Sequence, residues 1–317
     1  MQLFIQIPCY NEAATLPVTL AKIPRSVTGC RDVKVLIIDD GSTDNTIEVA
    51  RQNGADHIVK MTSHQGLARA FTMGMEASVK LGADIIVNTD ADNQYNAEDI
   101  NKLTAPITQK HADIVIGTRP IGQIQHFSFT KKLLQNIGSA IVRWISGVNI
   151  LDATSGFRAL NREAALKINI FSKYTYTLEM LIQAKQKNLT VVSVPIRVNG
   201  YLRPSRLAKS TLSYVLNSLQ TIIRISVNYH PFRFFFSIGT FFAVIGSLMI
   251  IRFLWLFYHH SGNGHVQSLI AASILLGLGF QIILTAFITD VSAINRRIME
   301  DVQYRLKKDQ LKDASHE

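Results

Sequence analysis

Two acidic residues, Asp90 and Asp92, follow the apolar run 85–88 with one residue between them. Carboxylates at this spacing after a buried strand can turn toward one point. There they suit a divalent cation that prefers oxygen ligands and also binds substrate phosphates. Gln94 can add an amide oxygen or a water contact. The structural alternative is that Asp92 caps the helix-like segment 96–105, but together with the motifs below the pattern favours a metal site.

A second acidic pair, Asp39 and Asp40, ends the apolar run 33–38 and is followed by the polar turn 41–43. One carboxylate of such a pair can bind a base or ribose hydroxyl while the other supports the loop. A hydroxyl of the turn is expected to cap the next helix. The chain has no Gly-x-Gly-x-x-Gly after its first apolar run and no Gly-x-x-x-x-Gly-Lys-Ser/Thr. The sequence therefore lacks the main motif expected of a dinucleotide-dependent dehydrogenase and the one expected of a P-loop enzyme.

A third group of polar residues lies later in the chain. Arg119 follows the apolar run 114–116, and Asp152 and Arg158 enclose a Thr-Ser-Gly-Phe segment. Asp152 is interpreted either as a turn residue or as a group that orients a substrate. Arg158 either binds a phosphate or pairs with Glu179.

The apolar runs that precede these residues recur at a regular spacing of about 25 to 30 residues. They cover 3–8, 33–38, 57–61, 85–88 and 114–116. A strand, a crossover helix and the next strand need this spacing, so we predict an α/β fold with a mostly parallel, doubly wound sheet. A helix over 175–188 and a strand over 190–196 complete it. Ligands of such sheets bind beyond the carboxyl ends of the strands, where the polar groups above are expected to meet.

The second half of the chain is apolar and basic. Phe234–Phe257 and Val266–Thr289 contain 24 residues each, with Arg252 as their one charge. At about 1.5 Å per residue each helix reaches roughly 36 Å, more than a hydrocarbon layer of about 30 Å. We therefore predict two transmembrane helices. The turn between them lacks Lys and Arg, whereas Arg233 and Arg296 lie on the other side, so the positive-inside rule places the first domain and both termini in the cytoplasm.

The charge distribution points to a membrane surface. The chain carries a net charge of +10, and between Glu179 and Asp290 it has nine Lys or Arg and no acidic residue. A basic stretch of this kind, rich in Phe, Ile and Leu, favours an anionic membrane over nucleic acid. Helical apolar spacing near 207–229 predicts an amphipathic interfacial helix. The predicted domains are a cytosolic domain (1–206), an interfacial helix (207–231), a transmembrane hairpin (232–290) and a cytosolic amphipathic tail (291–317).

The polar motifs together resemble those of glycosyltransferase family 2. They are Pro8–Glu12, the Asp39–Asp44 run, Gly66, Asp90-Ala91-Asp92, Gly117-x-Arg119 and Asp152–Arg158, in that order. With its two C-terminal apolar segments the chain resembles in particular the polyisoprenyl-phosphate glycosyltransferases, which include bactoprenol glucosyltransferases and dolichol-phosphate mannose synthases. The resemblance implies a GT-A fold and a nucleotide-sugar donor.

The resemblance also implies roles for individual residues. It assigns the donor to Pro8, Tyr10, Glu12, Asp39, Asp40, Asp90 and Ala91, and Mg²⁺ or Mn²⁺ to Asp90, Asp92 and Gln94. It assigns the acceptor phosphate to Arg119, Lys132 and Asn136, and the late basic motif of the family appears as Ser205-Arg206, preceded by Arg203. Arg158 is a further candidate for the acceptor phosphate, with the alternative given above, and Asp152, Asp92 and Arg119 are the candidate catalytic residues. The chain departs from the family pattern at Gln65, where Asn is usual, and at Arg203-Pro204, where a glycine is usual. Because a lipid phosphate is already ionised near pH 7, Asp152 is expected to orient the acceptor or the sugar more than to remove a proton.

The expected reaction is inverting, metal-dependent transfer of one hexose, glucose from UDP-glucose, to polyisoprenyl (undecaprenyl) phosphate at the cytosolic face of the plasma (inner) membrane. Transfer of mannose from GDP-mannose and an inactive membrane scaffold stay open as alternatives. A processive polysaccharide synthase is disfavoured because Ala140 stands where its Gln-x-x-Arg-Trp motif needs glutamine. Membrane lipids are expected partners, nucleic acid is not, and the short spans favour a homo-oligomer.

Overall fold

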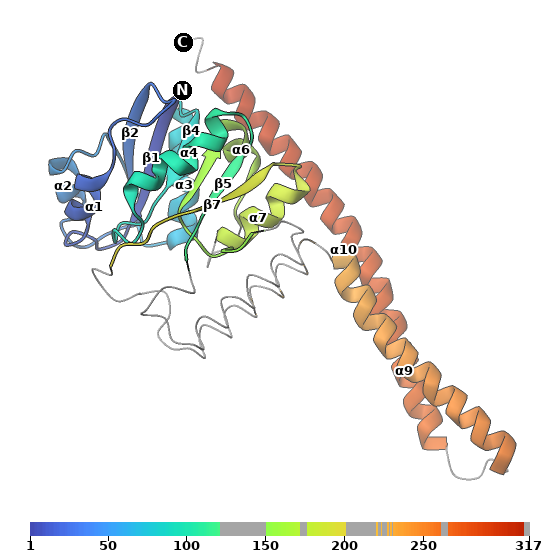
Figure 1. The fold of residues 1–317 in the computed structure, drawn as a ribbon. Coiled ribbons are helices and arrows are strands. Elements are labelled where there is room, and N and C mark those ends of the chain that lie inside the picture. The colour runs from blue at the N-terminus through green and yellow to red at the C-terminus, as the bar shows by residue number, and fades with distance from the viewer. Residues whose placement is uncertain are drawn as a thin grey trace. The chain divides into compact units, whose positions relative to one another are not determined.

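The computed structural model describes residues 1–120, 150–171, 176–200, 231–260 and 266–313, and positions 220, 223, 227 and 229 (Figure 1). The chain forms two compact units. Met1–Leu216 with Gln303–Glu317 is called the sheet domain below, and Asn217–Val302 the helical unit. Most of the predicted interfacial helix 207–231 lies outside the described residues. So do five of the predicted acceptor residues, namely Lys132, Asn136, Arg203, Ser205 and Arg206.

The sheet domain is built on a seven-stranded sheet in the order β3-β2-β1-β4-β6-β5-β7. The strands are β1 (Gln2–Cys9), β2 (Asp32–Asp39), β3 (His57–Lys60), β4 (Ile85–Asn88), β5 (Ile114–Thr118), β6 (Arg158–Asn161) and β7 (Val191–Pro195). All neighbours pair in parallel except β6, which is antiparallel to β4 and β5. The predicted mostly parallel sheet is thus confirmed, and each predicted apolar run coincides with a strand.

The antiparallel strand β6 was not among the predicted elements. It has only four residues and begins and ends with the polar residues Arg158 and Asn161, so it lacks the apolar run that marks the other strands. Arg158 pairs with Asn88, at the end of β4, and with Ile116 of β5. Since β6 runs against its neighbours, the segment that precedes Arg158 lies at the edge where β4 and β5 end.

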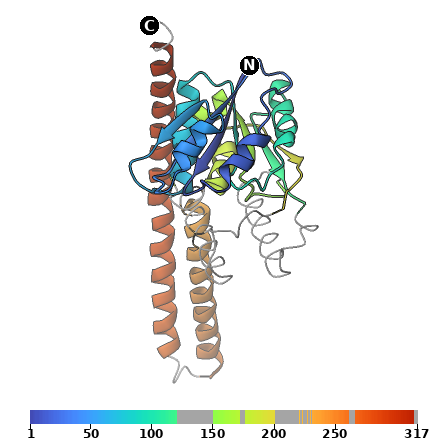
Figure 2. The same ribbon diagram turned by 90° about the vertical axis from the view of Figure 1, so that its left-hand side faces the viewer.

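Helices cover both faces of the sheet (Figures 1 and 2). They are α1 (Leu16–Lys22), α2 (Thr46–Gln52), α3 (Leu67–Lys80), the 3-10 helix η1 (Ala97–Asp99), α4 (Ile100–Thr108), α6 (Arg162–Lys167) and α7 (Thr177–Gln186). Successive side chains of a strand point to opposite faces. Leu3, Ile5 and Ile7 of β1 pack in one core cluster with α1 and α4, whereas Phe4 packs with α3 and α6 on the other face. Burial on both faces explains why the strands are continuous apolar runs.

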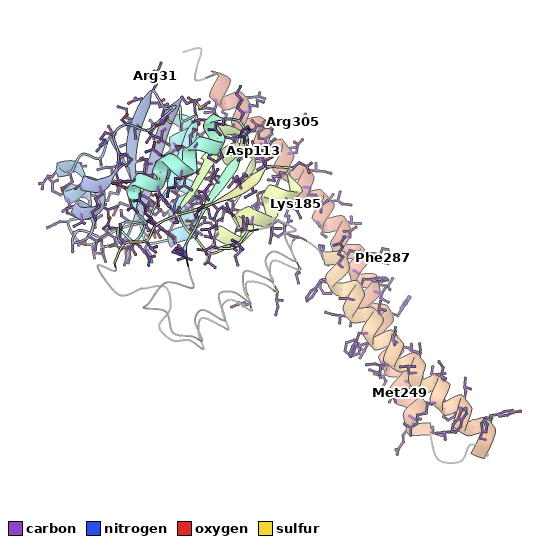
Figure 3. The ribbon with its side chains drawn as sticks, viewed as in Figure 1. Arg31, Asp113, Lys185, Met249, Phe287 and Arg305 are labelled. Carbon is purple, nitrogen blue, oxygen red and sulfur yellow. The ribbon has the colours of Figure 1, made fainter. Side chains whose placement is uncertain are left out.

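The helical unit contains two long apolar helices, α9 (Pro231–His260) and the larger part of α10 (Val266–Asp313). Both are long and apolar enough to cross a membrane, and only 11% and 17% of the residues in their most apolar windows are buried. Large apolar side chains such as Phe287 are exposed along them (Figure 3). This composition and exposure are typical of helices that face lipid.

The two helices approach each other closely at glycines. A Cβ on Gly279 would lie 2.9 Å from the backbone N of Ala243 and 2.9 Å from the backbone O of Gly239. Small residues are what allow helix backbones to pack this closely in a membrane, where burial of apolar surface gives no driving force. Ala272 and Ala286, seven residues before and after Gly279, are also fully buried. Three positions at seven-residue intervals on one face of α10, 272, 279 and 286, are thus occupied by small residues.

The last turns of α10, from Gln303 onward, belong to the sheet domain. The helix continues without a break to Asp313. Tyr304 Oη donates a hydrogen bond to Glu163 Oε1 at 2.6 Å, and Tyr304 and Leu311 pack against the core cluster that contains Phe4. These two apolar contacts explain why the segment joins the sheet domain.

The glycine contact predicts a sharp difference between two neighbouring positions of α10. Gly279→Ala should destabilise the protein by about 1–3 kcal/mol, because its Cβ meets backbone atoms that cannot move aside. Gly277→Ala is the matched control, since nothing lies within 4 Å of a Cβ there. Thermal unfolding of the full-length protein in detergent measures both variants. Equal unfolding temperatures would contradict the packing described here.

Candidate active site

The carboxyl ends of β1, β2, β4 and β5 lie at one edge of the sheet, as the sequence predicted. The last residues of β1 and β2, Cys9 and Asp39, lie side by side in register. Gln6 of β1 is the register partner of Asn88, the last residue of β4. The antiparallel β6 adds the segment 152–157 to the same edge. The loops at this edge carry Tyr10, Asp40, Asp90, Arg119 and Asp152.

The loops after β1 and β2 interlock. The Asn11 N–H donates to Ser42 Oγ at 2.9 Å, and the Thr43 N–H donates to Asn11 Oδ1 at 2.8 Å. Both carboxylate oxygens of the fully buried Asp39 lie 3.3 Å from the N–H of Ser42, from which they accept. Asp39 thus has the loop-supporting contact expected for one acid of the pair, and the turn is held rigidly from two sides.

The carboxylate of Asp40 holds the turn that follows β3. It accepts hydrogen bonds from the N–H groups of Gln65 at 2.7 Å and Gly66 at 2.8 Å. Nδ1 of His64 lies 2.8 Å from the same carboxylate, and the Tyr10 ring stacks on the His64 ring with centroids 3.9 Å apart. His64 was not among the predicted site residues, and its position directly before Gln65-Gly66 is the one signal of it in the sequence.

Three other predicted donor residues are tied into this edge. Pro8 lies in β1. Glu12 is buried, and its Oε2 accepts from the Thr15 hydroxyl at 2.6 Å. The backbone carbonyl of Ala91 accepts from the Thr19 hydroxyl of α1 at 2.8 Å. The loop after β4 is therefore fastened to the helix that follows β1.

The loop after β4 carries Asp90 and Asp92. Oδ1 of Asp92 accepts from the backbone N–H of Gln94 at 3.1 Å, so its carboxylate is oriented by its own loop. The helix cap that was the alternative role for Asp92 belongs to Asn96, whose Oδ1 accepts from the N–H of Glu98 at 3.0 Å. Asn96, and not Asp92, therefore caps this helix.

Gly156 joins the Asp90 loop to the segment before β6. Its N–H donates to Tyr95 Oη at 3.0 Å, and its carbonyl accepts from Asn88 Nδ2 at 2.9 Å and Tyr176 Oη at 3.3 Å. A Cβ at this position would lie 3.2 Å and 3.3 Å from the two carboxylate oxygens of Asp90. A side chain at this position would therefore press on the Asp90 carboxylate, which would have to move by a few tenths of an ångström.

Arg119 and Asp152 form a buried, two-pronged ion pair at the same edge. Nε of Arg119 donates to Oδ2 of Asp152 at 2.6 Å, and Nη2 donates to Oδ1 at 3.0 Å. The Thr154 hydroxyl donates to Asp152 and accepts from Arg119. Nη1 of Arg119 has no hydrogen-bond partner among the described residues. As far as the described part of the chain goes, this nitrogen is available to an anion.

The environment keeps both members of this pair charged. Burial alone would raise the pKa of Asp152, but hydrogen bonds and charge from Arg119, with help from Thr154, hold that pKa below its ordinary value. Burial works to lower the pKa of Arg119, but Tyr95, Asp152 and Asp90 raise it. An ionised carboxylate with a lowered pKa is a weak base at neutral pH. This agrees with an orienting role for Asp152.

Arg158 does not lie where a phosphate contact or a pair with Glu179 would place it. Its side chain is fully buried, and its guanidinium donates to the backbone carbonyls of Ala153 at 2.6 Å, Ser155 at 2.7 Å and Thr177 at 2.8 Å. Burial lowers the pKa of Arg158 to about 10. The guanidinium thus ties the segment around Asp152 to the start of α7, because the buried carbonyls of Ala153, Ser155 and Thr177 need donors that water cannot supply.

The described residues contain no group of three or more His, Cys, Asp or Glu side chains that could enclose a metal ion. Asp90, Asp92 and Gln94 offer two carboxylates and an amide oxygen instead. Such an incomplete set of hard oxygen ligands fits Mg²⁺ or Mn²⁺ that also binds substrate phosphates and water, rather than an ion held by protein alone.

A mostly parallel sheet with these acidic loops and a buried acid–arginine pair at its carboxyl edge defines a GT-A glycosyltransferase. Residues 4–168 match glycosyl transferase family 2, and the chain belongs to that family. The sequence-based assignment to this family is confirmed.

The chain is similar to several characterised relatives. It is 30% identical over 201 residues to polyprenol monophosphomannose synthase of Mycolicibacterium smegmatis, covering 60% of this chain and 74% of the relative. It is 31% identical over 206 residues to undecaprenyl-phosphate mannosyltransferase of Micrococcus luteus (62% and 83%). Dolichol-phosphate mannosyltransferase of Pyrococcus furiosus is 29% identical over 269 residues (81% and 72%).

Solved structures agree on the fold. Glucosyl-3-phosphoglycerate synthase from Mycobacterium tuberculosis, in complex with Mn²⁺, UDP-glucose and phosphoglyceric acid, superimposes with a TM-score of 0.56. The identity is 22%, and the match covers 70% of this chain and 79% of that one.

The close contact at Gly156 predicts that a single methyl group disturbs the Asp90 carboxylate. We expect Gly156→Ala to lower the transfer rate at least about 10-fold, because small displacements of a reacting group are costly. Gly200→Ala is the control, since nothing lies within 4 Å of a Cβ there. Transferase assays of both purified variants provide the measurement. Full activity of Gly156→Ala would show that the contact does not constrain Asp90.

The Arg119–Asp152 pair predicts a pH-dependent stability loss. Asp152→Asn leaves Arg119 buried without its counter-charge and should cost about 3 kcal/mol at pH 7. Because the pKa of Asp152 is lowered from 3.8, this stabilisation is present above that pH and disappears as pH falls through the folded-state value. The difference in unfolding temperature between the variant and the unaltered protein should therefore shrink below about pH 4.

Asp32→Asn is the control for this experiment. Asp32 lies 3.6 Å from Lys34 in an exposed pair, and such pairs contribute about 0–1 kcal/mol. A constant difference for Asp152→Asn from pH 7 down to pH 3 would contradict the assigned charge state.

Proposed function

We propose that this glycosyltransferase moves one hexose from a nucleoside diphosphate sugar to a polyprenyl phosphate, with inversion, at the cytosolic face of the plasma (inner) membrane. The observation that carries the proposal is the buried Arg119–Asp152 pair beside Asp90, in a chain that also has two exposed, apolar helices of membrane-spanning length. The names of the three relatives, all transferases of mannose to a polyprenyl or dolichol carrier, support it.

The donor is proposed to lie across the carboxyl edge. Its nucleoside would contact the loops of Tyr10 and Asp40, and its diphosphate the loop of Asp90, Asp92 and Gln94. Mg²⁺ or Mn²⁺ held by these three would offset the negative charge that builds on the leaving diphosphate. The interlocked loops keep the donor contacts in place before the substrate arrives, which favours the reaction because no reorganisation is then needed.

The acceptor phosphate is proposed to bind at Nη1 of Arg119. Its oxygen is already ionised near neutral pH, so no strong base is required, and the lowered pKa of Asp152 fits that requirement. Asp152 would fix the guanidinium by its two hydrogen bonds, so that the free donor points in one direction. Lys132, Asn136, Arg203, Ser205 and Arg206 remain proposed further contacts of the acceptor.

The sugar is the least constrained part of the proposal. Glucose from UDP-glucose follows from the two-span architecture, whereas the names of the relatives favour mannose. Both hexoses make the same demands on the groups described above, which act on the diphosphate and on the acceptor phosphate. We propose further that α9 and the apolar part of α10 span the membrane with both termini in the cytoplasm, and that the protein is a homo-oligomer.

A donor panel tests the proposed function. Purified full-length protein incubated with undecaprenyl phosphate, Mn²⁺ and radiolabelled UDP-glucose, UDP-galactose or GDP-mannose should yield a lipid-linked sugar from one of these donors. Asp92→Asn, which removes one proposed metal ligand, should reduce the product by at least about 100-fold. If no donor yields product, or if Asp92→Asn is as active as the unaltered protein, the proposal is wrong and a scaffold role gains support.

A further inference from the structure

A short segment after β7 pairs with the loop that follows Asp92. Val198 and Tyr95 form an isolated antiparallel bridge. The N–H of Asn199 donates to the carbonyl of Gln94 at 2.8 Å, and the N–H of Asn96 donates to the carbonyl of Arg197 at 3.3 Å. The backbone around Gln94 is therefore held in place by a segment that is distant in the sequence.

The side chain of Asn199 completes this contact. Its Nδ2 donates to the backbone carbonyls of Asn93 at 2.9 Å and Tyr95 at 3.2 Å, and lies 3.4 Å from Asn93 Oδ1. Together with its N–H, Asn199 thus binds three consecutive carbonyls of the loop. Asn93 has φ of +54°, in the left-handed region that non-glycine residues adopt only with support. The amide of Asn199 supplies that support by donating to the carbonyls of Asn93 and Tyr95, on either side of Gln94.

The segment that carries Asn199 is itself anchored. The N–H of Arg197 donates to Asp99 Oδ2 at 2.6 Å, and its guanidinium donates to Asp99 Oδ1 at 2.9 Å. Asp99 is fully buried at the start of α4, and Lys102 lies 2.9 Å from it. Asn199 can therefore hold the loop in place instead of following its movements.

We propose that Asn199 is a positioning residue for the oxygen ligands on Asp92 and Gln94. The inference rests on the proposed function, since it needs a divalent cation at this loop. Asp92 Oδ1 accepts from the N–H of Gln94, so any displacement of the Gln94 backbone also turns the carboxylate. Groups that orient metal ligands in this way typically change metal affinity by about 10–100-fold when they are removed.

Metal binding, measured apart from catalysis, tests this role. In full-length protein in detergent, the affinity for Mn²⁺ is measured by electron paramagnetic resonance with saturating UDP or GDP. We expect Asn199→Ala to weaken Mn²⁺ binding about 10-fold. Asn199→Asp should weaken it further, because its carboxylate oxygens face two carbonyl oxygens. The affinity for the nucleotide without metal should stay unchanged, because the hydrogen bonds of Asn199 described above go to the backbone of residues 93–95, whereas the nucleoside is proposed to contact the Tyr10 and Asp40 loops.

Asn53→Ala is the matched control. Its amide donates to the carbonyl of Val49 on the exposed surface of α2, and the variant should bind Mn²⁺ like the unaltered protein. Unchanged Mn²⁺ affinity in Asn199→Ala would overturn the inference. It would also be overturned if metal-free nucleotide affinity and unfolding temperature fell together with Mn²⁺ affinity, because Asn199 would then only support the fold. Failure of the unaltered protein to bind Mn²⁺ would overturn the proposed metal site as well.

Discussion

A buried pair of opposite charges places the strongest constraint on this active site. Asp152 and Arg119 are removed from water, so either one without the other would cost about 3–5 kcal/mol. The segment before β6 must therefore meet the end of β5 in one arrangement, and the antiparallel direction of β6 makes this possible. Arg158 at the start of β6 then donates to two carbonyls of this segment, those of Ala153 and Ser155, and to the carbonyl of Thr177 in α7. The relative position of β5 and the segment before β6 is therefore fixed by this ion pair, because a displacement of either residue would leave a buried charge unpaired.

A chain of polar side chains inside the apolar core carries this constraint across the sheet. Gln6 of β1 donates to Asn88 Oδ1 at 3.0 Å, and Asn88 in turn donates to the carbonyl of Gly156. Gly74 of α3 makes room for Gln6, since a Cβ there would lie 2.6 Å from its Oε1. A hydrogen bond between two buried side chains favours one relative position of the strands that carry them. The central strand β1 is thereby linked in fixed register to the glycine that adjoins Asp90.

The sequence predicted those features that depend on neighbouring residues in the chain. It did not predict features that arise only when distant segments meet in the fold. Apolar runs marked the strands, and the acids after them were correctly expected to share one edge. Nothing local marked β6, because it begins and ends with Arg158 and Asn161. The surroundings of Arg158 could not be read from the sequence, because β6 itself was missed. An arginine in this motif can bind a phosphate or pair with Glu179, and only the fold shows that its side chain is fully buried. His64 was likewise unremarkable until the turn brought it to Asp40 and Tyr10.

The strand β6 also accounts for how the C-terminal end of the chain relates to the site. Its first residue shapes the segment around Asp152, and its last residue, Asn161, caps α6 through a hydrogen bond to the N–H of Ala164 at 2.7 Å. Glu163 of that same helix accepts the hydroxyl of Tyr304, from the last turns of the helix that contributes the second apolar segment. One end of this four-residue strand therefore lies at the carboxyl edge of the sheet, and the other leads into α6, whose Glu163 contacts α10. Because both contacts depend on the register of β6, a slip of one residue would reverse its faces and break them together.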